Sequence, residues 1–370
     1  MRFLGAVVAI AVLCVLPAVS GCSKSSEVEG TAPERVSGRL LVGISEPNAW
    51  RALQPKATAD QIASYLKRLG VSAHRWVVDW SLVERTPPAG GTHRYDFSRF
   101  DEMYQADVRA GIRPFVQLLN APDWAANAEE ARGPYANPPP APDHLADWGD
   151  FAAAVAERYP KAVAIEVWNE PNLTTFWGTQ SSETPPDPAR YTELLKVAYD
   201  AIKEVRPDLP VVGGALSSNE NTSPGGNISY VDFLRGMLRD GAAAHMDGVS
   251  IHAYPRGQGL DRVGLVLGTV RDELARAGYP MPIWLTETGL STEGEFAVDP
   301  EAQGEGLVAI YKEVRRMGDV EAMFIHNLVP SELDPHAEGS GYALLGQAQP
   351  GAPLRPKPAF FALRRALRGQ

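Results

Sequence analysis

The stretch Ala164-Ile165-Glu166-Val167-Trp168-Asn169-Glu170-Pro171-Asn172 contains an apolar run of β-strand character that stops at Asn-Glu-Pro. Proline cannot donate a ladder hydrogen bond, so Glu170 stands where a buried strand gives way to a loop. The run Pro282-Ile283-Trp284-Leu285-Thr286-Glu287-Thr288-Gly289 has the same pattern and places Glu287 at a second strand end. In one sheet, these two carboxylates would face one cleft.

Short β-rich runs alternate with helical patterns from about Arg39 onward, which is typical of βα units around a parallel sheet. We predict strands at 39–44, 72–80, 113–119, 163–168, 210–215, 247–254, 282–286 and 320–327. We predict helices at 59–69, 97–110, 145–159, 189–205, 230–238, 261–277, 300–317 and 357–367. Eight of each predict an α/β fold, a (β/α)8 TIM barrel over residues 39–370. An open doubly wound sheet would need a glycine-rich first turn, which residues 43–47 lack.

The N-terminus has the pattern of a targeting segment rather than of a folded domain. Arg2 precedes an apolar stretch over 3–19, which predicts a secretory signal peptide at 1–21. The end of this segment, Ser20-Gly21-Cys22, resembles a bacterial lipobox, and a flexible linker is predicted at 22–38. We therefore expect a bacterial cell-surface lipoprotein outside the cytoplasm, in contact with the membrane only through a lipid on Cys22. The alternatives are an uncleaved anchor helix, or a plain signal peptide and a secreted protein.

Composition excludes several classes of function. The net charge is −10 and no basic stripe occurs, so nucleic acid is not an expected partner. The chain has two cysteines, Cys14 in the apolar leader and Cys22, so the barrel is expected to hold neither a disulfide nor a cysteine metal site. No His-Glu-x-x-His spacing occurs, and we expect no metal and no cofactor. The oligomeric state stays open.

Polar and aromatic side chains gather at the predicted strand ends, which is where barrels of this kind carry their active sites. Two carboxylates at such a mouth are what cleavage of a glycosidic bond needs. The set, in chain order, is Arg75, Asp79, Trp80, Asn120, Trp124, Asn169, Glu170, His252, Tyr254, Glu287, His326 and Asn327.

Two of these strand ends, Trp168-Asn169-Glu170-Pro171 and Thr286-Glu287-Thr288-Gly289, resemble clan A glycoside hydrolases, as do Arg75 and His252-Ala253-Tyr254. Within the clan, Trp-Asn-Glu-Pro-Asn and Pro122-x-Trp124 look most like the family 39 xylosidase branch, with cellulase-like family 5 close behind. The resemblance implies a retaining hydrolase of β-linked poly- or oligosaccharides that acts by double displacement. Glu170 would be the general acid/base and Glu287 the nucleophile, with no cofactor.

The resemblance also implies roles for neighbouring residues. Arg75 would keep Glu287 ionised, Tyr254 would orient it, and Asn169 would bind the sugar 2-hydroxyl. Simpler roles stay open: Arg75 could form a structural ion pair, and His252 could be a core histidine. Glu166, deeper in the barrel, could pair with Arg75 or with His74. Trp168 is equally suited to barrel packing. The full set of predicted substrate-binding residues is Arg75, Asn169, His252, Tyr254, Trp80, Asn120, Trp124, His326 and Asn327; Trp80, Trp124 and Trp177 would stack on sugars or pin loops.

One departure from the clan pattern concerns the eighth strand. Many members carry a tryptophan at its end, where this chain has His326-Asn327, so polar contacts to the sugar are expected there. A glycan-binding barrel without turnover and a transglycosylase remain alternatives. A metal hydrolase is disfavoured because His252 and His326 are too few ligands. The sugar, the linkage and the choice between internal and terminal cleavage are left open.

Overall fold

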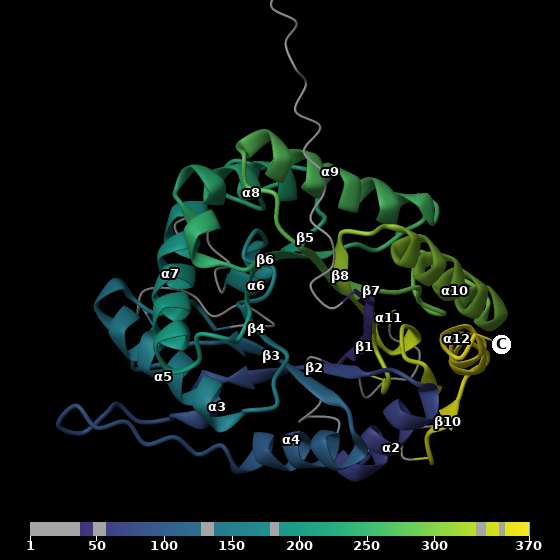
Figure 1. Ribbon diagram of the computed structural model, residues 1–370, viewed down its shortest axis with the longest axis horizontal. Helices are drawn as coiled ribbons and strands as arrows, with labels where there is room; N and C mark the ends of the chain where they lie inside the picture. Colours follow the sequence, from purple (N-terminus) through teal and green to yellow (C-terminus); the bar gives the residue numbers. More distant parts are fainter. Residues whose placement is uncertain are drawn as a thin grey trace, which may run out of the picture. The chain divides into compact units, whose positions relative to one another are not determined.

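The computed structural model describes residues 38–46, 57–126, 137–177, 185–330, 338–347 and 352–369. Its eight main strands form one closed barrel in the order of the chain, and neighbouring strands are parallel, with β8 closing on β1 (Figure 1). The predicted signal peptide, Cys22 and the linker up to residue 37 lie outside the described residues. The strands are β1 (Leu41–Ser45), β2 (Ala73–Asp79), β3 (Arg113–Leu119), β4 (Ala164–Val167), β5 (Val211–Ser217), β6 (Gly248–His252), β7 (Ile283–Thr288) and β8 (Val320–His326).

Helices surround this barrel on all sides of the view in Figure 1, which confirms the predicted (β/α)8 architecture. The main helices are α2 (Ala59–Leu69), α4 (Ser98–Ala110), α5 (Leu145–Arg158), α7 (Pro188–Val205), α8 (Tyr230–Arg239), α9 (Asp261–Ala277), α10 (Pro300–Arg316) and α12 (Pro358–Leu367). Short elements lie in the connections: α3 (Trp80–Val83), η1 (Pro142–His144), α6 (Thr174–Trp177), η2 (Ala242–His245), α11 (Glu338–Gly341), β9 (Leu345–Gly346) and β10 (Arg355–Pro356).

None of the helices in the described part of the chain has the length and apolar character needed to cross a membrane.

Helix α2 shows how local sequence sets the element boundaries. Thr58 and Gln61 form a reciprocal capping box at its start, which satisfies backbone donors that the first turn leaves free. The helix ends at Gly70, whose φ of 98° lies in the left-handed region that glycine tolerates best. Its predicted apolar stripe of Ile62, Leu66 and Leu69 is fully buried. Capping and periodicity therefore agree on the same boundaries.

The interior of the barrel is closed below the mouth by aromatic packing. The Phe115 ring of β3 lies 5.4 Å from Trp284 of β7 and 5.0 Å from Phe324 of β8, measured between ring centroids. Strands β3 and β7 are not neighbours, so these rings meet across the barrel. Gly43 makes room for them, because a Cβ there would lie 2.4 Å from the Phe324 ring. This apolar floor supports the polar residues at the strand ends above it.

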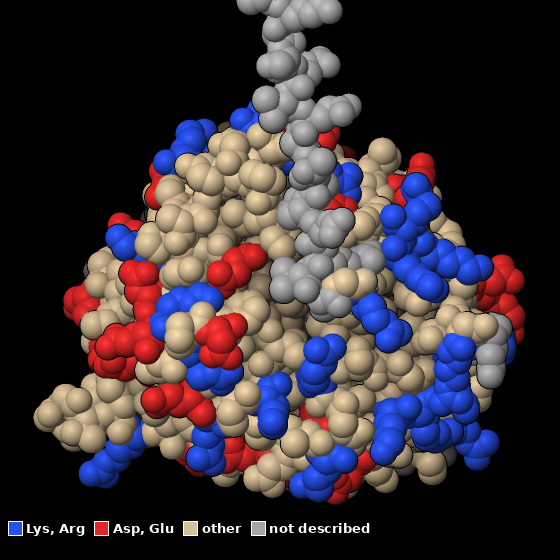
Figure 2. Space-filling view, viewed as in Figure 1, with Lys and Arg blue, Asp and Glu red and all other residues tan. Residues whose placement is uncertain are grey.

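Lys and Arg side chains gather over the part of the surface formed by α2, α10 and α12, whereas Asp and Glu are more frequent over α5 and α7 (Figure 2). Basic residues occupy the last turns of α2, α10 and α12, where their positive charge offsets the negative end of each helix dipole. These residues are Lys67, Arg68, Arg315, Arg316, Arg364 and Arg365.

Candidate active site

The Glu287 carboxylate, near the end of β7, is bound from several strands. Its Oε1 accepts hydrogen bonds from Arg75 Nη1 at 2.6 Å and from the Ser45 hydroxyl at 3.3 Å, and its Oε2 accepts one from the Tyr254 hydroxyl at 2.8 Å. Burial alone would raise the pKa of Glu287, but the nearby positive charge of His252 and Arg75 outweighs it and holds the pKa well below its usual range. Glu287 is therefore a carboxylate kept ionised.

Glu170 follows β4 with a left-handed backbone, at φ 41°. Its Oε1 accepts a hydrogen bond from His252 Nδ1 at 2.9 Å. Trp168, at φ 72°, and Asn120, at φ 63°, directly follow β4 and β3 and share this uncommon conformation, as does Ala215 within β5, at φ 44°. Such backbone strain gathers at functional sites, where the surrounding structure maintains it.

His252 at the end of β6 links the two carboxylates. Its Nδ1 lies 2.9 Å from Glu170 Oε1 and 3.6 Å from Glu287 Oε2, so these two oxygens lie at most about 6.5 Å apart, the sum of the two distances. Its Nε2 lies 3.4 Å from Arg75 Nη2. Burial lowers the pKa of His252, but Glu287 and Glu170 raise it further, and the net shift is upward. His252 therefore lies between the two carboxylates, and its predicted role in substrate binding stays a prediction.

A buried network below Glu287 fixes Arg75 and Asn169. Arg75 Nη2 lies 2.7 Å from Glu166 Oε2, so Glu166 pairs with Arg75, while His74 contacts Asp107 instead, at 2.9 Å. Arg75 therefore has both of the roles considered for it, an ion pair inside the barrel and a contact to Glu287. Asn169 Oδ1 accepts from Arg75 Nη2 at 3.3 Å and from Gln117 Nε2 at 3.1 Å, which turns its amide NH2 away from these donors.

The prediction that Trp80 contacts sugar is wrong. Its side chain is fully buried, its ring stacks on Phe151 at 5.5 Å, and its Nε1 donates to Glu84. The reason is that β2 ends at Asp79 and the chain turns at once into α3, which directs Trp80 outward against α5. Trp168 and Trp177 are also fully buried and pack against each other at 5.9 Å.

Trp124 and Asn120 lie at the rim rather than against the carboxylate pair. Trp124 is half-buried, donates to the Glu84 carbonyl at 3.0 Å and packs edge-on against Trp80, so it pins the loop after β3. Asn120 donates to Asp79 Oδ2 at 2.7 Å and accepts from the Asn137 backbone at 2.9 Å. Their predicted contacts with sugar stay predictions.

At the end of β8, His326 takes the position at the mouth. Its Nδ1 lies 4.0 Å from Glu287 Oε2, and its ring packs against Tyr254 and Tyr342 at 6.3 and 5.6 Å. Burial lowers the pKa of His326, which favours the neutral ring. Asn327, joined to His326 by a cis peptide bond, is fully buried, so its predicted role in substrate binding is wrong.

Three residues of this site were not predicted. Ser45 is the last residue of β1, one position beyond the predicted strand, and Gln117 is the one polar residue within the apolar run of β3 after Arg113. A polar residue alone in a buried strand is a signal that could have identified Gln117. Tyr342 follows α11, and no periodic pattern marks that segment.

The site thus contains the ionised Glu287 carboxylate and a second carboxyl group, that of Glu170, with the His252 imidazole close to both. Such a pair can act as nucleophile and proton donor. Within the described residues, no group of three or more His, Cys, Asp and Glu side chains has an arrangement that could hold a metal ion.

Comparison with known proteins relates residues 52–264 to the family model "Glycosyl hydrolases family 39". The chain is 28% identical over 169 residues to a β-xylosidase of Geobacillus stearothermophilus, covering 43% of this chain and 31% of that protein. It is 26% identical over 235 residues to a β-xylosidase of Caldicellulosiruptor saccharolyticus, covering 58% of this chain and 44% of that protein. The matched regions thus span less than half the length of these relatives.

Two solved structures have the same fold. A family 39 glycoside hydrolase from Bacteroides cellulosilyticus matches with a TM-score of 0.66 at 22% identity, covering 89% of this chain and 63% of that one. A β-xylosidase from Caulobacter crescentus matches with a TM-score of 0.64 at 22% identity, covering 90% of this chain and 72% of that one.

Proposed function

This chain belongs to family 39 of the glycosyl hydrolases, and on that premise we propose that it is a retaining glycosidase that hydrolyses a β-linked glycan. The observation that carries the proposal is the unequal environment of its two strand-end carboxylates. Glu287 is held ionised by Arg75 and Tyr254, whereas the Glu170 carboxyl group accepts a hydrogen bond from His252. Retaining glycosidases require such a pair, one nucleophile and one proton donor, with carboxyl groups about 5–5.5 Å apart. The upper limit set by His252 is compatible with that separation.

In the first step, a Glu287 oxygen attacks the anomeric carbon of the bound sugar. The bond from that carbon to the leaving oxygen breaks, and protonated Glu170 donates its proton to this oxygen. Arg75 and Tyr254 keep Glu287 ionised and aimed before attack. His252 Nδ1–H then stabilises the carboxylate that Glu170 becomes when its proton leaves.

In the second step, a water molecule attacks the anomeric carbon of the glycosyl–Glu287 ester. Glu170 takes a proton from this water, the ester bond breaks, and Glu287 is released as a carboxylate. The amide NH2 of Asn169, turned away from Arg75 and Gln117, is positioned to donate to a sugar hydroxyl. The site returns to its starting protonation state with the configuration at the anomeric carbon retained.

We further propose a β-xylosidic substrate as the first to test, because two relatives are β-xylosidases. We also propose that the leader sequence directs the enzyme out of the cytoplasm and that a lipid on Cys22 anchors it. An external location would suit an enzyme that degrades poly- or oligosaccharides.

The test is incubation with 2-deoxy-2-fluoro-β-D-xylosyl fluoride, followed by intact mass and peptide mapping. The 2-fluoro group slows hydrolysis of the intermediate, so one glycosyl group should accumulate on Glu287. The Glu287→Gln variant is the control and should remain unlabelled. An adduct on another residue, or a first product of inverted configuration by NMR, would contradict the mechanism. Glycan binding by wild type without turnover on xylosides, glucosides or mannosides would favour a binding protein instead.

A further inference from the structure

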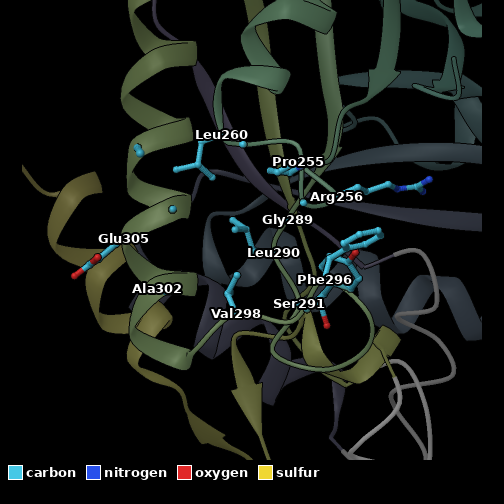
Figure 3. A pocket seen from close by; sticks show the side chains of 15 residues that line it. Pro255, Arg256, Leu260, Gly289, Leu290, Ser291, Phe296, Val298, Ala302 and Glu305 are labelled. Atoms are coloured by element: carbon cyan, nitrogen blue, oxygen red, sulfur yellow. The ribbon is translucent and has the colours of Figure 1, made fainter.

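A cavity of about 490 Å³ lies beside the active site, outside the ends of β6 and β7 (Figure 3). Its walls come from the loop between β6 and α9, the loop between β7 and α10, and one face of α10 itself. Small-molecule sites in proteins usually have volumes between about 300 and 1,000 Å³. The volume of this cavity is therefore that of a ligand site, and the catalytic scheme above makes no use of it.

The lining of this cavity is mostly apolar, and its polar residues include Arg256 and Ser291. Leu290 and Val298 point into the space beside α10, and the Glu305 carboxylate points away from it (Figure 3). Phe296 and Leu260 line the cavity although they are 45% and 36% exposed, which is unusual for large apolar side chains. An uncharged apolar group fits such walls, whereas a bare sugar, with hydroxyls that need partners, does not.

Helix α10 leaves room for that group. Its residues facing the cavity include Ala302, Gly306 and Ala309, all of them small. A Cβ on Gly306 would lie 3.1 Å from Leu290, so even a methyl group there would crowd the wall. Because Ala302 and Ala309 line the cavity, larger side chains at these positions would occupy it.

The cavity adjoins the nucleophile's surroundings at Tyr342. Tyr342 lines the cavity, and its ring packs against Tyr254 and His326, with centroids 5.4 and 5.6 Å away. Tyr254 binds Glu287, and Gly289, two residues after Glu287, also lines the cavity. A Cβ at Gly289 would lie 2.7 Å from the His326 carbonyl oxygen and 2.9 Å from the Tyr342 ring. The absence of a side chain at Gly289 therefore allows His326 and Tyr342 to pack closely against its backbone.

The position relative to Glu287 indicates which part of a substrate would enter. In the proposed first step the leaving group departs in line with the attack, away from Glu287 and towards Glu170 on β4. The cavity lies outside β6 and β7, on the nucleophile's side. The part of the substrate nearest to a cavity on this side is the sugar that remains bound to the enzyme, rather than the leaving group.

We propose that this cavity is a subsite for an apolar acyl or alkyl substituent carried by the sugar bound at Glu287. The enzyme would then act on glycans whose terminal or cleaved residue bears such a group. This proposal rests on the proposed glycosidase function and adds a substrate class to it.

The experiment uses the full chain and compares 4-nitrophenyl β-D-xylopyranoside with its mono-O-octanoyl esters. The corresponding glucosides and mannosides are included, because a mannosidase and a glucosidase are among the structural neighbours. Ala302→Phe and Ala309→Phe fill the cavity. Lys312→Phe adds the same ring to an exposed position of α10 that does not line the cavity, and is the matched control. Binding of octyl β-D-xylopyranoside, by calorimetry, tests an apolar group on the leaving-group side.

We expect the ratio of kcat/KM for the best ester to kcat/KM for its parent to exceed tenfold in wild type, since each buried methylene contributes about a fourfold gain. Ala302→Phe and Ala309→Phe should lower this ratio at least tenfold, and Lys312→Phe should leave it at the wild-type value. Equal ratios in all four proteins would overturn the subsite while leaving the glycosidase proposal intact. A cavity-filling effect on octyl xyloside affinity, but not on the esters, would overturn the assignment to the bound sugar. Absence of turnover on every glycoside would instead contradict the proposed function itself.

Discussion

The two sides of the barrel mouth treat the same chemical group differently. On the β7 side, the Glu287 carboxylate accepts hydrogen bonds from an arginine and two hydroxyls, which come from β1, β2 and the end of β6. On the β4 side, the Glu170 carboxylate accepts from His252, and its own backbone has a left-handed conformation. Sequence makes both residues glutamates at strand ends, but only their surroundings make them different acids.

The difference teaches how a barrel assigns two roles to one residue type. A fixed guanidinium and a phenol stabilise the ionised form of Glu287, so that carboxylate is available as a nucleophile. An imidazole can serve Glu170 in both protonation states, because it is itself a titratable group near neutral pH. The surroundings of Glu287 on the β7 side therefore suit nucleophilic attack, and those of Glu170 on the β4 side suit proton transfer.

The most severe way to break this asymmetry is Glu287→Gln. Glutamine cannot form the glycosyl ester, so we expect kcat to fall on the order of 10⁵- to 10⁶-fold, the scale of a lost nucleophile. The measurement is steady-state hydrolysis of an activated aryl glycoside. Circular dichroism of the variant controls for folding. Residual activity within a hundredfold of wild type would mean that another group attacks the sugar.

Glu170→Gln should have a smaller effect that depends on the leaving group. General acid–base catalysis contributes about 10²- to 10⁴-fold, so kcat/KM should fall by that factor for a glycoside with a poor leaving group. A 2,4-dinitrophenyl glycoside needs little protonation and should lose much less in kcat/KM. The comparison of the two substrates in one variant is its own control. Equal losses on both would show that Glu170 does not protonate the leaving oxygen.

Tyr254→Phe sharpens the comparison with the smallest change, since it removes one hydroxyl from the β7 side. A hydrogen bond to a charged group contributes about 1.5–3 kcal/mol, which corresponds to a loss in kcat/KM of roughly 10- to 150-fold. The lost bond stabilised the ionised form, so the pKa of Glu287 rises in the variant. Because the reaction needs ionised Glu287, activity at low pH is lost first, and the acidic limb of the kcat/KM profile moves to higher pH. A profile with an unchanged acidic limb would show that Tyr254 does not tune Glu287.

The eight strands and their helices could be predicted from alternating short apolar runs and helical periodicity. Helix α9, for example, was predicted at 261–277 and has those bounds, because its apolar spacing and Gly278 leave little choice. Glu170 and Glu287 were predicted as a pair from strand-end position. Trp80 and Asn327 failed for a common reason: position at a strand end does not say whether a side chain turns towards the mouth or is buried in the surrounding protein.

The sequence by itself determined the barrel and placed Glu170 and Glu287 at strand ends, because these follow from local periodicity and from proline and glycine after the strands. Only the tertiary structure decided that Ser45, Arg75 and Tyr254 meet on Glu287 and that His252 joins it to Glu170. These contacts span up to 242 positions in the chain. Closure of the barrel alone sets such distances, and no local pattern encodes them. The cavity beside Tyr342 has the same origin, since three separate segments form its walls.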